Sequence, residues 1–133
     1  MTTIALATTE RLYKNNGQEA ERVFRFTMTG ELAKADNLPH DLGADCLGYQ
    51  VKSARATVCR GTDILAYLAT DKATAYAYVS ADFTTAYLMT KAEYIAFVNE
   101  FGTITTESAK NGGHTKIRLK AEGKEMREWL ARA

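Results

Sequence analysis

The sequence predicts a mixed α/β protein, and three observations carry that prediction. Apolar residues recur at helical spacing in several segments of the chain. Between those segments lie short runs in which apolar and polar residues alternate, as they do in strands with one covered face. The chain contains one proline and no low-complexity segment or internal repeat. Helices and strands in this order pack as layers, so we expect a central mixed sheet flanked by helices.

The first half of the chain contains a helix, a long strand and a short helix. Residues 18–28 place Ala20, Val23 and Phe24 on one helical face, behind a turn at Asn15 that supplies a capping side chain. Residues 49–58 alternate cleanly and predict one strand. A short helix is expected to follow, from a cap at Thr62 through residue 68.

The second half contains a hairpin, a helix, a strand and a closing helix. Residues 74–80 and 84–89 are rich in Tyr, Val and Thr and predict the hairpin. Thr90 and Glu93 form a capping-box signature, and Gly102 ends the helix that follows. Residues 115–120 alternate again, and Met126 and Trp129 mark one face of the last helix.

Length, charge and cysteine usage narrow the class of protein. The 133 residues favour a single domain, 1–133. Seventeen basic and sixteen acidic residues leave a net charge of +1, so a nucleic acid would have to meet a local basic patch. Cys46 and Cys59 lack zinc-site spacing and are expected to be buried thiols in a reducing cytoplasm. No signal peptide or long apolar run is seen, which predicts a soluble cytoplasmic protein with no membrane contact.

Gln50 and Lys52 are the residues that point to chemistry. They are two positions apart on the strand 49–58, so their side chains leave the same face. Ala54, Ala56 and Val58 continue that face, which therefore is expected to look toward a covering helix. A buried ammonium needs compensation, and a carboxylate or a site that holds a metal and a phosphate would supply it.

Nearby acidic residues complete a candidate metal site. Asp45 precedes the strand, Asp41 lies before it, and Glu21 reaches the same face if its helix packs there. Carboxylate and amide oxygens are hard ligands that suit Mg²⁺, with Mn²⁺ as an alternative. A metal-bound water can become the attacking hydroxide, while lysine offsets charge on a phosphate.

The run from Asp45 to Ser53 resembles the PD-(D/E)xK nuclease superfamily, to which many restriction endonucleases belong. In that family an acid closes one strand, an acid-x-Lys tripeptide lies on the next, and a preceding helix often carries a Gly-x-x-Ala-Glu pattern. Residues 17–21 match that pattern, which favours Glu21 over Glu19. The resemblance implies a restriction-endonuclease-like fold and a Mg²⁺-dependent DNA endonuclease that acts as a homodimer. It also implies Glu21, Asp45 and Gln50 as metal ligands and Lys52 as the group that orients water and phosphate.

The chain departs from the family pattern at two points. Gln50 replaces the acid of acid-x-Lys, so it offers an oxygen to a metal without charge. Only four residues separate Asp45 from Gln50, which is short for a hairpin, whereas eight separate Asp41 from Gln50. Asp45 is preferred, with Asp41 as the competing acid.

Weaker patterns indicate contacts to nucleic acid and a second interpretation. Ser53, Arg55 and Arg60 lie beside or after the proposed centre and are candidates for phosphate or base contacts. Lys116, Arg118 and Lys120 form a basic stripe on the last strand, where a solvated face is the ordinary alternative. Because the acid is missing at position 50, a non-catalytic nucleic-acid-binding or accessory module that keeps the nuclease fold is the alternative hypothesis.

Overall fold

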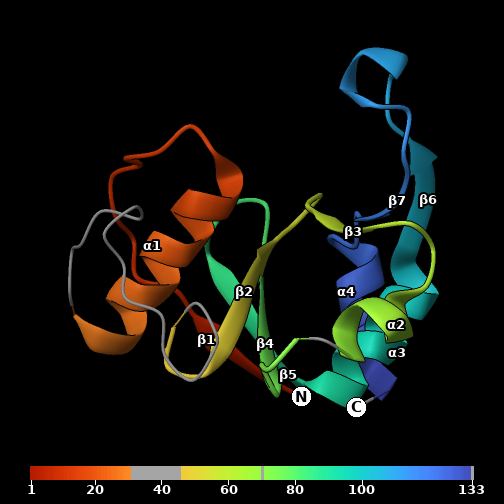
Figure 1. Ribbon diagram of the computed structural model, residues 1–133. Helices are drawn as coiled ribbons and strands as arrows, with labels where there is room; N and C mark the ends of the chain where they lie inside the picture. Colours follow the sequence, from red (N-terminus) through yellow and green to blue (C-terminus); the bar gives the residue numbers. More distant parts are fainter. Residues whose placement is uncertain (31–45, 70, 133) are drawn as a thin grey trace.

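The computed structural model describes residues 1–30, 46–69 and 71–132, and it contains helices and strands in a mixed order (Figure 1). The strands are β1 (Thr2–Ala5), β2 (Tyr49–Ser53), β3 (Thr57–Arg60), β4 (Ala75–Val79), β5 (Thr85–Thr90), β6 (Gly102–Thr106) and β7 (Thr115–Leu119). The helices are α1 (Asn16–Thr29), α2 (Ile64–Ala69), α3 (Lys91–Phe101) and α4 (Lys124–Arg132), with a 3₁₀ turn at Ala109–Asn111. The mixed α/β class is therefore confirmed.

The strands of the described residues form two sheets rather than one central sheet. The first sheet has the order β1-β5-β4-β2, in which β2 and β4 are parallel and the other pairs are antiparallel. The second sheet has the order β3-β7-β6 and is wholly antiparallel. The chain crosses from β2 to its parallel neighbour β4 by way of β3 and α2.

The prediction of one strand over residues 49–58 was wrong. The chain leaves the first sheet at Ser53, turns through Ala54 and Arg55, and joins the second sheet at Thr57. Arg55 has a φ of 66°, a left-handed conformation that a strand residue does not adopt. Ala54 and Val58 nevertheless pack in the same apolar cluster as Tyr76 and Tyr78, the register partners of Gln50 and Lys52, as expected. Ala56 lies between the turn and β3.

The predicted helix ends agree closely with the structure. Asn15 caps α1 by accepting a hydrogen bond from the Gln18 N–H, and Thr90 and Glu93 form the expected capping box at α3. At α2 the cap is Asp63 rather than Thr62, because the Asp63 carboxylate accepts from the Ala66 N–H at 3.0 Å.

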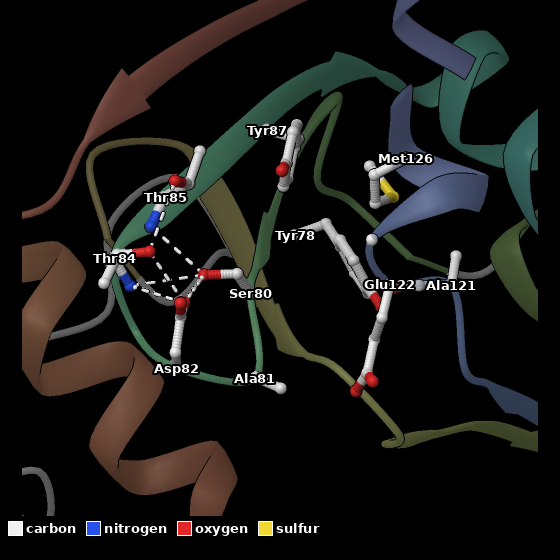
Figure 2. Close-up of a pocket in the computed structure, with 11 residues that line it drawn as sticks. Tyr78, Ser80, Ala81, Asp82, Thr84, Thr85, Tyr87, Ala121, Glu122 and Met126 are labelled. Atoms are coloured by element: carbon white, nitrogen blue, oxygen red, sulfur yellow. Dashed lines mark hydrogen bonds between the residues drawn. The ribbon is translucent and has the colours of Figure 1, made fainter. Parts of the chain in front are cut away.

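The hairpin of β4 and β5 is confirmed, and its turn is held by side chains. Asp82 Oδ1 accepts hydrogen bonds from the hydroxyls of Ser80 and Thr84, both at 2.7 Å (Figure 2). These bonds hold the pKa of the Asp82 carboxyl below its ordinary value. The Asp82 carboxylate therefore stabilises the turn between β4 and β5.

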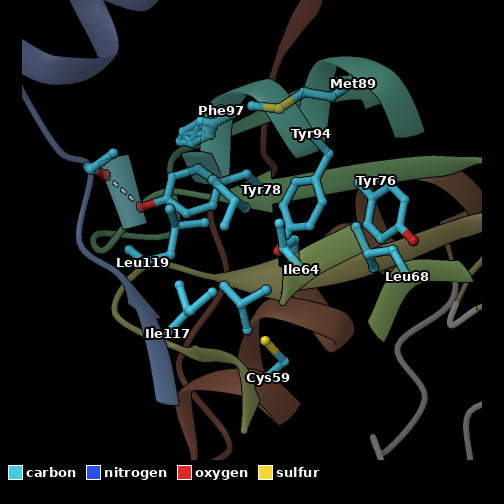
Figure 3. Packing of buried hydrophobic residues seen from close by; sticks show 14 of the residues in the cluster. Cys59, Ile64, Leu68, Tyr76, Tyr78, Met89, Tyr94, Phe97, Ile117 and Leu119 are labelled. Carbon is cyan, nitrogen blue, oxygen red and sulfur yellow. Dashed lines mark hydrogen bonds between the residues drawn. The ribbon is translucent and has the colours of Figure 1, made fainter. Parts of the chain in front are cut away.

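Two apolar clusters cover opposite faces of the first sheet. On one face, Ala20, Val23 and Phe24 of α1 pack against a cluster that includes Val51 and Val79. On the other face the aromatic residues of β4 pack under α3, where Tyr76 stacks on Tyr94 at 4.4 Å and Tyr78 meets Phe97 (Figure 3). The second cluster continues into the second sheet, α2 and α4. No helix among the described residues has both the length and the apolar character to cross a bilayer.

Candidate functional site

A tight turn leads into β2, the strand that carries the candidate residues. Cys46 and Tyr49 pair through two backbone hydrogen bonds of 3.0 and 2.8 Å across Leu47 and Gly48. Both turn residues have positive φ, 49° and 84°, as a two-residue hairpin turn requires. A reversal of chain direction therefore fits within the four residues between Asp45 and Gln50. The short spacing consequently does not count against Asp45 as the acid that precedes β2. Asp45 and Asp41 themselves lie outside the described residues.

Gln50 and Lys52 share a face of β2, as predicted. In the parallel register they lie beside Tyr76 and Tyr78, so they occupy the face that packs under α3. Both side chains are half-buried. Within the described chain neither side chain has a hydrogen bond, and Lys52 has no carboxylate partner. The Lys52 ammonium therefore has no counter-charge among the described residues, which makes this face a candidate for binding an anion.

Glu21 is not on that face. It belongs to α1, which packs against the opposite face of β2 through the cluster that contains Val51. The sequence-based condition, that the helix of Glu21 should cover Gln50 and Lys52, is therefore not met. Across the part of the chain that the structure describes, no group of three or more His, Cys, Asp or Glu could hold a metal. The described residues do not by themselves form a Mg²⁺ site, and the four-residue centre stays a prediction that depends on Asp45.

Glu19 has a structural role that its position in the first helical turn did not reveal. Its carboxylate receives Arg22 Nε at 2.8 Å and Nη2 at 2.7 Å, and both side chains are almost completely buried. Arg22 also donates to Thr9 Oγ1 and to the Glu10 carbonyl. The pair ties α1 to the segment that follows β1, so Glu19 is not available to a metal.

The residues predicted to contact nucleic acid differ in accessibility. Ser53 is only 4% exposed, so it can contact only a group that enters the protein. Arg55 is exposed and forms an ion pair with Glu122, with Nε 3.0 Å from Oε1. Arg60 is also exposed and pairs with Glu107 at 3.1 Å.

The outer face of the second sheet brings several cations together. We call Arg60, Lys116 and Arg118 the basic face. Arg60 pairs with Lys116 in register, and Arg118 follows two positions along β7, so all three leave the side opposite the buried Ile117 and Leu119. In the described chain Lys116 has no carboxylate partner, and Arg118 donates only to the Arg55 carbonyl. The expected shared face is confirmed for Lys116 and Arg118, whereas Lys120 lies just beyond the end of β7. Arg60 extends the face.

Both cysteines are buried thiols outside any disulfide, as the sequence predicted. Burial, with a smaller contribution from Asp63, raises the pKa of the Cys59 thiol. A thiol of this kind is a poor nucleophile, so Cys59 belongs to the core.

Comparison of the chain with protein-family models, with curated proteins and with solved structures finds no match.

Proposed function

We propose that the protein is a Mg²⁺-dependent DNA endonuclease of restriction-like type, with Asp45, Gln50 and Lys52 at its centre. The observation that carries the proposal is the half-buried Lys52 side chain, which shares a face of β2 with Gln50 and has no carboxylate partner among the described residues. A lysine in this setting supplies a fixed positive charge for a phosphate, and its neighbouring amide offers one oxygen. The tight turn before β2 and the parallel pair β2 and β4 are compatible with a restriction-endonuclease-like core.

Within this proposal Asp45 would supply the charge that a metal needs, with Gln50 as a neutral ligand. Glu21 would not join them, because α1 covers the other face of β2. Bound Mg²⁺ would supply the activated water, and Lys52 would hold the scissile phosphate. By resemblance to the family, cleavage of both strands would need a homodimer.

The test is incubation of the protein with supercoiled plasmid in Mg²⁺ or Mn²⁺, with EDTA as the negative control. Lys52→Ala should lower the nicking rate about 10²–10³-fold, the order seen when one group that stabilises transition-state charge is removed. Lys110→Ala is the matched control, because Lys110 is exposed on the distant 3₁₀ turn. Asp45→Asn should also abolish nicking, whereas Glu21→Gln should leave the rate within about threefold, because α1 covers the opposite face of β2.

Equal activity of Lys52→Ala and wild type would contradict this centre, as would failure to nick methylated and unmethylated DNA alike. A homodimer that cuts both strands would convert plasmid directly to the linear form, with a rate that rises with protein concentration beyond first order. Accumulation of only nicked circles at every concentration would argue against paired centres.

We propose as the second candidate a non-catalytic DNA-binding module that keeps this fold. The basic face favours it, because Lys116 and Arg118 present charge without a carboxylate partner in the described chain. The absence of an acid at position 50 and the location of α1 on the far side of β2 favour it as well.

Binding to labelled duplex DNA at several salt concentrations separates the two candidates. Lys116→Gln should weaken binding equally for all sequences and reduce the salt slope by about 0.9, the contribution of one phosphate contact. Arg127→Gln, an exposed arginine on α4, is the charge-matched control. Binding that survives EDTA, without any nicking, would leave the binding module as the better account.

A further inference from the structure

A small cavity lies where the parallel strands β2 and β4 end. Its volume is about 210 Å³. Its lining includes Arg11, Asn16, Ser53, Arg55 and Phe83. Crevices at the carboxyl ends of parallel strands are common ligand sites in α/β proteins. The volume is below the roughly 300 Å³ of pockets for drug-sized ligands, so it suits a single small group.

The cavity lining is cationic. It includes two arginines and no carboxylate. Arg55 is offset by Glu122, outside the lining, at 3.0 Å. Arg11 is different, because among the described residues its guanidinium donates only to neutral oxygens: the carbonyls of Tyr13 and Lys14 at 2.7 and 2.8 Å and Asn16 Oδ1 at 2.7 Å.

Arg11 is also held in place. Its guanidinium lies 5.0 Å from the centroid of the Phe83 ring, and its Nε and Nη2 are both engaged. Nη1 has no hydrogen bond within the described chain. With one amino group free and no counter-charge among the described residues, this guanidinium is arranged to receive an oxyanion.

Ser53 supplies a second and independent indication of a ligand. The residue is only 4% exposed, and its hydroxyl makes no hydrogen bond in the described chain. Ser53 is one of the residues that line the cavity. Buried hydroxyls are normally satisfied, and an acceptor in the cavity would satisfy this one.

The amino end of α1 adds to the same charge. Asn16, the first residue of this 14-residue helix, lines the cavity. The positive end of a helix dipole and its free N–H groups favour an anion at that position.

We propose that this cavity binds a phosphate group, which accepts hydrogen bonds from Arg11 Nη1 and the Ser53 hydroxyl. The site is independent of the proposed nuclease centre, because Ser53 leaves the face of β2 opposite to Gln50 and Lys52. The group could come from free phosphate or from the phosphorylated end of a nucleic acid, and the two sources share this chemistry.

The test measures binding of inorganic phosphate by calorimetry and by ³¹P resonance at constant ionic strength, with chloride as the control anion. Wild-type protein should bind one phosphate and melt at a higher temperature in its presence. Arg11→Gln should weaken binding at least about tenfold, the loss of one charge-assisted bond, and Ser53→Ala about threefold. Arg127→Gln removes an exposed positive charge from α4 and should bind as wild type does.

Ser53→Ala removes a hydroxyl that has no hydrogen-bond partner among the described residues, so we expect the variant to fold normally. Loss of phosphate binding in this variant would therefore report loss of the site rather than loss of the fold. Oligonucleotides with a 5′-phosphate or a 5′-hydroxyl identify the source. Competition between the phosphorylated end and free phosphate would assign the site to nucleic-acid ends, and binding of free phosphate alone would assign it to a small anion. Absence of any phosphate binding, or an equal loss in Arg127→Gln, would overturn the proposal. None of these measurements requires nicking activity.

Discussion

Glu19 and Arg22 form an ion pair that is withdrawn from solvent, with exposed fractions of 2% and 1%. Burial by itself would raise the pKa of Glu19. The hydrogen bond and charge of Arg22 outweigh that effect, and the N–H groups of Leu12 and Tyr13 assist, so the pKa is held below its ordinary value. A buried pair of this kind is neutral or weakly favourable as a whole, but loss of one member leaves an uncompensated charge.

Removal of the Glu19 charge should therefore be strongly destabilising. We expect Glu19→Gln to lower the free energy of unfolding by about 3 kcal/mol or more, measured by urea titration at neutral pH. Glu128→Gln is the control, because Glu128 is half-exposed and lies 3.8 Å from Lys124, and its effect should stay within about 0.5 kcal/mol. Equal effects of the two substitutions would contradict the role given to the buried pair.

The same pair predicts the response to acid. The unfolded chain has the higher glutamate pKa and binds more protons, so the stabilising contribution of Glu19 is complete above that pKa. It is lost as the pH falls from about 4.3 through the lower folded-state pKa. Urea titrations across this range should show a shallower acid loss in Glu19→Gln than in wild type.

Leu47 occupies a left-handed position that favours other residues. Its φ is 49° in the turn before β2, and its side chain is 47% exposed. Asn tolerates this conformation, and Asn-Gly is the preferred pair in such turns. Leu47→Asn should raise the free energy of unfolding by about 0.5–1 kcal/mol. Leu47→Ala removes the same exposed side chain but does not favour the left-handed conformation, so it should not raise the free energy of unfolding. If Leu47→Ala stabilised the protein as much as Leu47→Asn does, turn geometry would not be the cause.

At the scale of elements, Gly102 is needed for space rather than for backbone freedom. Its φ is an ordinary −68°. A Cβ atom there would lie 2.5 Å from the Val98 carbonyl oxygen and 2.9 Å from Ile117 Cγ2, so α3 and β7 approach too closely for a side chain. The glycine lets the chain pass directly from α3 into β6.

Gly102→Ala should therefore be destabilising although alanine favours helices. We expect a loss of about 1–3 kcal/mol in thermal or urea unfolding, the usual range for overpacking. Thr103→Ala, at the exposed neighbouring position, should change stability by less than about 0.5 kcal/mol. A neutral Gly102→Ala would mean that α3 and β7 can separate without penalty.

The elements that local sequence predicted are those whose signals are local. Caps at Asn15 and Thr90 and apolar spacing identified α1 and α3, and tyrosine-rich alternation identified the β4 and β5 hairpin. Strand β1 was missed because it forms only by pairing with the distant β5. Strand β6 pairs with the next strand, β7, but its residues contain a single large apolar side chain and so show no alternation. The division of residues 49–58 into two strands was missed because the alternation of apolar and polar residues continues through Arg55. The residue types at this point do not indicate that Arg55 has a left-handed φ.

The candidate site, like the fold, was predictable from the sequence only where the signal is local. That Gln50 and Lys52 share a face follows from strand geometry alone. Whether Glu21 joins them depends on which face of the sheet α1 covers, and an amphipathic helix pattern does not specify that choice. The cavity beside Ser53 depends on segments far apart in sequence, from Arg11 to Phe83, and no local pattern marked it.

At the scale of the whole molecule, Tyr78 connects the two sheets. It lies in β4, and its hydroxyl donates to the carbonyl of Ala121, which follows β7 (Figure 3). The side chain is 1% exposed, and burial raises the pKa of the phenol, so it remains a neutral donor. The bond therefore joins the first sheet to the segment between β7 and α4.

Tyr78→Phe should weaken the whole fold. Loss of a buried bond that leaves the Ala121 carbonyl without this donor should lower the free energy of unfolding by about 1–3 kcal/mol. Tyr87→Phe is the control, since Tyr87 is half-buried on the neighbouring strand and its hydroxyl has no hydrogen bond in the described chain. A Tyr78→Phe protein as stable as the control would show that the sheets do not depend on this bond.

The turn at Ala54 and Arg55 has a consequence for how the molecule opens. The Ala54 N–H donates to Val79 in the first sheet at 2.9 Å, and the Arg55 N–H donates to Leu119 in the second sheet. Two successive amides are thus protected by different sheets. If the sheets opened independently, these two amides would exchange with deuterium at different free energies; because one short turn is fixed to both, we expect them to exchange together, at the free energy of global unfolding.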